Sequence, residues 1–159
     1  MVAVCIGNAL TLMGDREQAY AYYEKALKMT EEKYPVYISY AISLTEFKEY
    51  DMAEGMYKRA IENDSTQSLA YILLANLYTN HNKVKEAIEV YKQALRVDQN
   101  NAEIYCLLGN AHYLDNDVEK AIMSYRASIT LEPTNDEYRL IYSQVVEDYM
   151  KTIREGANA

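Results

Sequence analysis

The sequence predicts an all-α fold, a solenoid of four helical hairpins of 34 residues each with one further helix after them. Two observations carry this prediction. The segment LGNAHYLDNDVEKAIMSY at 108–125 nearly repeats LANLYTNHNKVKEAIEVY at 74–91, and the same pattern occurs without insertion at 40–57 and 6–23. The chain also has only 5 glycines and 2 prolines among its 159 residues, which favours helices over a turn-rich β fold.

Three positions of the repeat keep their residue type in all four units. They hold an alanine (Ala19, Ala53, Ala87, Ala121), a tyrosine (Tyr23, Tyr57, Tyr91, Tyr125) and a small residue (Gly7, Ala41, Ala75, Gly109). Helices approach closely only where the side chains between them are small. We therefore expect the small residues at the crossing of the two helices of each hairpin, with the tyrosine filling the space one turn further on.

Each unit contains two helical stretches separated by a short turn. In the third unit, both 70–80 and 84–97 carry apolar residues at the i, i+3, i+4, i+7 spacing of a helix face. The turn position holds Gly14, Asn82 and Asn116, which tolerate a left-handed backbone, but Lys48 in the second unit. We expect Lys48 to be mildly strained.

The predicted units span 1–33, 34–67, 68–101 and 102–135, followed by a capping helix at 136–152. One hairpin cannot bury both faces of its helices, so the units must stack, and a polar-sided helix can close the array. We expect a single domain over 1–152, Asp136 as the cap of the last helix, and a disordered tail at 153–159.

These repeats resemble the tetratricopeptide repeat family, whose pattern is W-x2-L-G-x2-Y, then A-x3-F, then P. Leu74-Ala75 and Leu108-Gly109 stand in the Leu-Gly place, and every unit keeps Ala-x3-Tyr. The final proline occurs only as Pro133, so we expect the second helices of the other units to run on slightly. The resemblance implies a right-handed solenoid whose first helices line a concave groove.

Composition argues against several classes of partner. The formal net charge is −8, and no basic stripe is present to bind nucleic acid or an anionic membrane surface. No apolar run approaches the 18 residues of a membrane-spanning helix. Cys5 and Cys106 lie outside any C-x-x-C pair, which favours free buried thiols in a reducing compartment and a cytoplasmic location.

No pattern of catalytic residues stands out. His81 and His112 are the only histidines, and His112 occupies an aromatic place of the repeat, so packing explains it. The cysteines and histidines lack metal-ligand spacing, and neither a phosphate-binding glycine loop nor G-x-S-x-G occurs. We therefore expect no enzyme activity, no catalytic residue, no cofactor and no metal.

The first helices carry a second face that is more apolar than a solvated face should be. Asparagine recurs on it, and an asparagine amide both donates and accepts, so it can hold the backbone of an extended peptide. Packing against neighbouring helices explains Ile72 about equally well. The predicted peptide-binding residues are Asn8, Leu12, Ile42, Ile72, Asn76, Asn80, Asn110, Tyr113 and Glu137.

Some members of the family bind the acidic C-terminal tails of heat-shock chaperones through lysine, asparagine and further basic residues. The matching places hold Val4, Asn8, Ser39, Leu69 and Leu73 from the first unit, and Ile38, Ile42, Leu73, Glu103 and Leu107 from the second. Only the asparagine at 8 matches, so an acidic tail is not expected. The acidic far end of the groove favours a neutral to basic partner.

The sequence thus predicts a non-catalytic scaffold that binds a peptide or helix of a partner protein in its concave groove. Two alternatives are a small acidic chaperone of the secretion type and a substrate-recognition module of a larger enzyme. Met1 falls inside the first helix with no capping residue ahead of it, and Val2 and Ile6 are apolar. We expect either that the natural protein continues upstream or that this helix mediates self-association.

Overall fold

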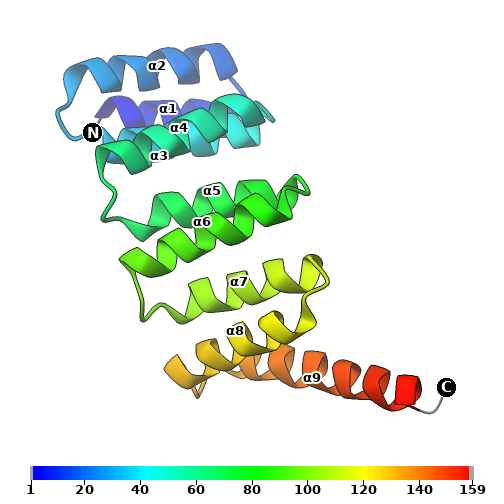
Figure 1. Ribbon diagram of the computed structural model, residues 1–159. Helices are drawn as coiled ribbons and strands as arrows, with labels where there is room; N and C mark the ends of the chain where they lie inside the picture. Colours follow the sequence, from blue (N-terminus) through cyan, green and yellow to red (C-terminus); the bar gives the residue numbers. More distant parts are fainter. Residues whose placement is uncertain (1, 158–159) are drawn as a thin grey trace. The chain divides into compact units, whose positions relative to one another are not determined.

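The computed structural model describes residues 2–157, which form nine α-helices and no strand. Figure 1 shows successive helices running back and forth, joined by short turns. The helices are α1 (Val2–Met13), α2 (Arg16–Met29), α3 (Tyr34–Glu46), α4 (Tyr50–Asn63), α5 (Ser68–Asn80), α6 (Val84–Val97), α7 (Ala102–Leu114), α8 (Val118–Leu131) and α9 (Asp136–Ala157). The prediction of an all-α helical repeat is confirmed.

The turn inside each predicted unit contains one left-handed residue, as the sequence predicts. The φ angles are 81° at Gly14, 63° at Lys48, 58° at Asn82 and 62° at Asn116. The residue after each of them donates its backbone N–H to a carbonyl five positions earlier, for example Glu49 N to Leu44 O at 2.8 Å. This bond closes the preceding helix. Lys48 bears a strain on the order of 1 kcal/mol that glycine would avoid.

The three recurrent positions form the contact between the helices of a hairpin. All four recurrent alanines are fully buried, and all four recurrent tyrosines are nearly so. A Cβ atom on Gly7 would lie 2.8 Å from Cε1 of Tyr23, and one on Gly109 would lie 2.6 Å from Cε1 of Tyr125. Each of these tyrosine rings therefore lies against the backbone of a glycine. The contact is possible because glycine has no side chain that would keep the ring away.

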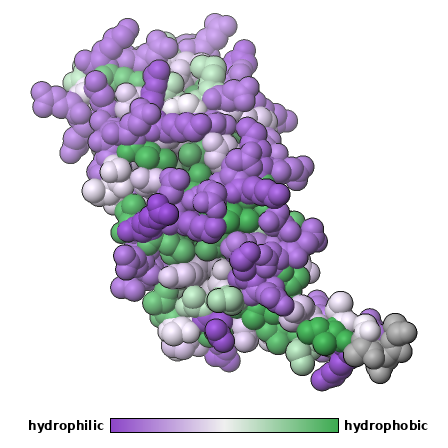
Figure 2. All heavy atoms as spheres, viewed as in Figure 1, coloured by the Kyte–Doolittle hydropathy of each residue, from purple (hydrophilic) through white to green (hydrophobic). Residues whose placement is uncertain are grey.

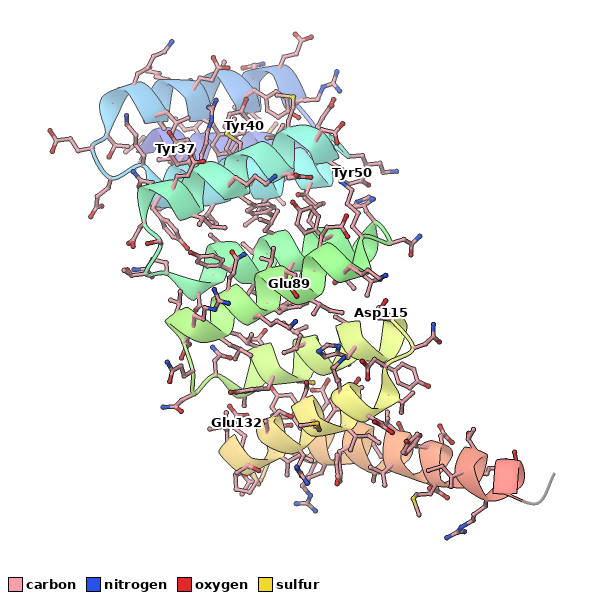
Figure 3. All side chains as sticks on the ribbon, viewed as in Figure 1. Tyr37, Tyr40, Tyr50, Glu89, Asp115 and Glu132 are labelled. Carbon is pink, nitrogen blue, oxygen red and sulfur yellow. The ribbon has the colours of Figure 1, made fainter. Side chains whose placement is uncertain are left out.

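The chain forms two compact units, and the boundary falls between Leu77 and Tyr78, inside α5. The single domain expected over 1–152 therefore stays a prediction. In the first unit, aromatic side chains join α2 to α3. Tyr40, labelled in Figure 3, stacks on Tyr23 with ring centroids 5.0 Å apart and lies 5.4 Å from the ring of Tyr20. An ion pair of 2.8 Å between Arg16 and Glu49 adds a surface contact.

In the second unit, α9 packs on the hairpin of α7 and α8. Cys106, Ala121 and Tyr125 are buried there, and the partly buried side chains of α9 that pack on them are Tyr138, Ile141, Tyr142 and Val145. The expectation of a polar outer side holds only in part. Leu140, Met150 and Ile153 are exposed, and Figure 2 shows a hydrophobic patch over the far part of α9.

The expectation that helices without the final proline run on is wrong. The second helices end at Met29, Asn63, Val97 and Leu131, which is the same position of the repeat each time. The residues after them leave the helical conformation without help from proline. Asp64, for example, has φ −146° and its carboxylate accepts hydrogen bonds from Thr66 N and Thr66 Oγ1. Such a side-chain turn competes with continuation of the helix.

Two expectations for α9 are also wrong. The cap is Asn135 and not Asp136, because Asn135 Oδ1 accepts from the backbone N–H groups of Glu137 and Tyr138 at 3.1 and 3.3 Å. The helix does not stop at 152, since 153–157 is helical and no glycine or proline interrupts it before Gly156. The rest of the expected tail, 158–159, lies outside the described residues, and so does Met1, which the sequence predicts to lie inside the first helix.

Candidate partner-binding site

An open pocket of about 420 Å³ lies in the first unit, between α1 and α3. Its lining comes from the last turns of these two helices and from one recurrent tyrosine of α2. The lining residues are Asn8, Thr11, Leu12, Tyr23, Ser39, Ile42, Ser43 and Glu46. Three of the predicted peptide-binding residues therefore come together here, namely Asn8, Leu12 and Ile42.

The upper walls of the pocket are apolar and open to solvent. The side chain of Leu12 is 90% exposed and that of Ile42 is 42% exposed. An exposed Leu alone needs no explanation, but two large apolar side chains on either side of one pocket are a typical feature of a binding surface.

Hydrogen bonds hold the floor of the pocket. Tyr23 donates its hydroxyl proton to Asn8 Oδ1 at 2.7 Å, and Thr11 donates to the backbone oxygen of Gly7 at 3.0 Å. Ser43 Oγ lies 2.6 Å from Thr11 Oγ1. Either hydroxyl can be the donor of this bond, because Thr11 has one proton and three acceptors within reach, namely Gly7 O, Tyr23 Oη and Ser43 Oγ. All three hydroxyl groups of the floor thus take part in hydrogen bonds inside the protein.

This arrangement gives two of the recurrent asparagines a structural role, and their role in peptide binding stays a prediction. The oxygens of Asn8 and Asn110 are each engaged by a recurrent tyrosine, because Tyr125 likewise donates to Asn110 Oδ1 at 2.8 Å in the second unit. What Asn8 presents to a ligand is mainly its amide N–H groups. At these two positions the sequence analysis did not foresee that the asparagine accepts from a buried hydroxyl, which needs a partner.

The second hairpin shows what happens without that asparagine. Ile42 stands in its place, and the hydroxyl of Tyr57 forms a side-chain hydrogen bond with Thr45 instead. Burial raises the pKa of Tyr57, and this hydrogen bond opposes the rise. Burial also raises the pKa of Tyr125, to about 12. These tyrosines are neutral hydrogen-bond donors and suit no proton-transfer role near neutral pH.

The other predicted peptide-binding residues differ in placement. Ile72 is buried, which favours the packing alternative for this side chain. Asn76 is half-buried and Asn80 is exposed on α5. Asn110 and Tyr113 on α7 and Glu137 on α9 are exposed in the second unit. A role in binding stays a prediction for all of these residues.

Three lining residues of α3 were not among the predicted binding residues, namely Ser39, Ser43 and Glu46. Ser39, Ile42, Ser43 and Glu46 follow the i, i+3, i+4, i+7 spacing, so they form one stripe along α3. Of these, only Ile42 was predicted to bind. The same spacing that predicts a core-facing stripe could have found this one, had the polar members been included.

Cys106 and His112 are the side chains that most resemble catalytic residues, and both are buried, which disfavours their charged forms. Burial raises the pKa of the Cys106 thiol to about 11 and lowers the pKa of His112. Cys5 is exposed, so the expectation that both thiols are buried is wrong for it. Over 2–157, the structure brings no three metal-ligating side chains together, and no helix is long and apolar enough to span a membrane.

Comparison with known proteins gives the family. Models of the tetratricopeptide repeat match residues 6–33, 56–89 and 102–135, and a further model of the same repeat matches 75–116. No curated protein sequence matches the chain.

Solved structures share the fold. The first tetratricopeptide domain of Spaghetti (RPAP3), solved with HSP90 peptide SRMEEVD, has a TM-score of 0.69 at 19% identity and covers 76% of this chain and 96% of its own. MamA has a TM-score of 0.70 at 20% identity, covering 94% of this chain and 97% of its own. A double mutant of MamA RS-1 has a TM-score of 0.72 at 16% identity, covering 99% and 94%. The chain belongs to the tetratricopeptide repeat family, whose repeats are typically non-catalytic modules for protein–protein interaction.

Proposed function

We propose that the chain binds an extended segment of a partner protein in the pocket between α1 and α3. The observation that carries the proposal is the pair of exposed apolar side chains, Leu12 and Ile42, on either side of an open cavity of about 420 Å³. Covering these side chains with an apolar group of the partner removes them from water, which supplies a driving force for binding.

The rigidity of the pocket also supports this function. The hydrogen bonds among Asn8, Tyr23, Thr11 and Ser43 fix the floor before any ligand arrives. A site that is already ordered loses less conformational entropy on binding. The amide N–H groups of Asn8 can donate to a backbone carbonyl of an extended segment without recognising its side chains.

The partner proposed here differs from the one seen with Spaghetti. The peptide bound to that protein, SRMEEVD, contains three acidic residues. The pocket of this chain is lined by no lysine or arginine, and its one charged lining residue is Glu46. An acidic peptide would therefore meet repulsion here.

Selection of peptides on the intact chain tests the proposal. Random dodecapeptides displayed on phage are selected against immobilised chain, and the enriched peptides are titrated against the wild type, Leu12→Glu and Met13→Glu. Met13 is the matched control, because it adjoins Leu12 on α1, is 79% exposed and does not line the pocket. We expect Leu12→Glu to weaken binding about tenfold or more and Met13→Glu to have little effect.

Circular dichroism establishes that both variants remain helical. Equal affinity of the wild type and Leu12→Glu for every enriched peptide would place the binding surface elsewhere.

A further inference from the structure

The charge around the pocket is one-sided. Glu46 is the last residue of α3 and lines the pocket, and it forms no ion pair within residues 2–157. Arg16, at the start of α2, is paired with Glu49 at 2.8 Å and not with Glu46. Lys48 lies in the turn after α3 but does not line the pocket. The fixed charge facing a ligand is therefore negative.

The ends of two helices add to this potential. The pocket is lined by the last turns of α1, from Asn8 to Leu12, and of α3, from Ser39 to Glu46. A helix carries a partial negative charge at its C-terminal end, where cationic side chains are stabilising. Neither α1 nor α3 has a basic residue in its last turn. No cation of these helices occupies the position where one is favoured.

The hydrogen-bonding groups left for a ligand are few and defined. The hydroxyl groups of Tyr23, Thr11 and Ser43 are hydrogen-bonded within the floor, and the oxygen of Asn8 accepts from Tyr23. Besides the hydroxyl of Ser39, a ligand therefore meets the N–H donors of Asn8 and the carboxylate acceptor of Glu46. A ligand that satisfies these groups carries a carbonyl that accepts from Asn8 and a positively charged donor that pairs with Glu46. It also carries an apolar group that lies between Leu12 and Ile42.

We propose that the pocket recognises a segment in which a large apolar side chain is followed closely by lysine or arginine. This inference rests on the proposed function and adds the chemistry of the partner. The apolar side chain covers Leu12 and Ile42, and the cation pairs with Glu46 at the end of α3. The volume of about 420 Å³ leaves room for the aliphatic stem of the basic residue, which packs well on apolar surface.

The probes are four capped octapeptides that share the same Ser/Gly flanking residues and differ only in their central pair. The central pairs are Leu-Lys, Leu-Ser, Leu-Glu and Ser-Lys. Each is titrated into the full chain labelled with ¹⁵N, at low ionic strength, and chemical shifts are followed at Asn8, Ile42 and Glu46. We expect Leu-Lys to bind about fivefold or more tightly than Leu-Glu, since an exposed ion pair contributes up to about that factor and repulsion adds to it. Ser-Lys should bind more weakly than Leu-Lys, because it lacks the apolar side chain.

Variants of Glu46 test whether the preference for Leu-Lys over Leu-Glu depends on the charge of this residue. Glu46→Gln should reduce the preference for Leu-Lys over Leu-Glu to near one, and Glu46→Lys should reverse it. Glu17→Gln is the control, because it changes the net charge by the same amount at an exposed position of α2 outside the pocket. It should leave the preference unchanged.

The possible failures are distinguishable. If Leu12→Glu abolishes binding but the four peptides rank without regard to charge, the pocket stands and the charge preference is refuted. A preference that survives in Glu46→Gln refutes the role of Glu46. If no peptide shifts Asn8 or Ile42, or binding is insensitive to Leu12→Glu, then both the preference and the proposed binding pocket are refuted.

Discussion

The hairpin of α1 and α2 and the hairpin of α7 and α8 are built alike but surrounded differently. In both, a glycine lies under a tyrosine ring, and the asparagine after the glycine accepts the tyrosine hydroxyl proton. Yet Val2 and Ile6 on α1 are 75% and 37% exposed, whereas the matching Ile104 and Leu108 on α7 are 0% and 7% exposed. The inside of a hairpin thus depends on its own residues, and the burial of its outer face depends on other helices.

The two hairpins also differ in the hydrogen-bond acceptors that lie near the hydroxyl of the recurrent tyrosine. Tyr23 lies 3.2 Å from Thr11 Oγ1 in addition to its bond with Asn8. In the other hairpin the position of Thr11 is occupied by Tyr113, and within residues 2–157 the Tyr125 hydroxyl has Asn110 as its one acceptor. The first hairpin therefore has a second acceptor close to its tyrosine, and the last hairpin does not.

The largest expected effect comes from adding a side chain at a glycine under a tyrosine ring. Gly109→Val should lower the free energy of unfolding by about 3 kcal/mol, because even a Cβ at this position would lie 2.6 Å from Tyr125. Gly55→Val on α4 is the control, since no atom lies within 4 Å of its Cβ position, and we expect a change under about 0.5 kcal/mol. Urea unfolding measures both variants. Equal losses would mean that the contact with the ring is unimportant.

A smaller effect is expected from removing the acceptor of the tyrosine. Asn110→Ala should cost about 1–2 kcal/mol, because the buried hydroxyl of Tyr125 loses its partner. Asn8→Ala should cost less, since Tyr23 can turn to the second lone pair of Thr11 Oγ1. Thermal unfolding of both variants tests the order.

Removing the hydroxyl as well isolates this interaction. Tyr125→Phe combined with Asn110→Ala should recover part of the loss in a double-mutant cycle. Tyr20→Phe is the control, because the Tyr20 hydroxyl is buried and has no hydrogen-bond partner among the described residues. It should leave stability unchanged or raise it. Additive losses of Asn110 and Tyr125 would show that the bond contributes nothing.

The third prediction concerns pH and separates the hairpins by a titrating group. His112 on α7 is buried, and the matching residue on α1 is Leu10. Burial, partly opposed by the charge of Asp117, lowers the pKa of His112 below its ordinary value of about 6.5. Below about pH 6.5 the unfolded chain binds a proton that the folded chain resists, so stability falls as pH falls and levels off below the folded pKa.

We expect this loss to be smaller than that of Asn110→Ala. The difference in stability between pH 7.5 and pH 5.5 should shrink in His112→Tyr, which places at 112 the residue found at the matching position 78. An unchanged difference would assign the pH dependence to other groups.

The weakest expected effect is association through the exposed side of α1. This helix has no charged residue, so two copies would meet no repulsion between like charges there. We expect sedimentation to show reversible association that rises with concentration, and Val2→Glu with Ile6→Glu should reduce it. Leu140→Glu, at an exposed leucine of α9, serves as the control. Sedimentation as a monomer at every concentration would contradict this expectation.

Much of the fold could be predicted from the sequence because it depends on short distances along the chain. The period of 34 residues predicts the helix pairs, and the left-handed position predicts the turn at Lys48 as well as those at Gly14, Asn82 and Asn116. The contact of Gly7 with Tyr23 was predictable for the same reason, since both belong to one hairpin.

Only the tertiary structure decided how these parts form a pocket. Leu12 and Ile42 are 30 positions apart, and they share a pocket because α1 packs beside α3. Which way the Asn8 amide points depends on the hydroxyl of Tyr23, and the hydrogen-bond partner of Ser43 is Thr11 from another hairpin. A repeat pattern records which residues face one side of a helix. Which side chains meet across two helices, and which hydrogen bonds they complete, depends on the packing of one hairpin on the next. The period of the sequence does not encode that packing.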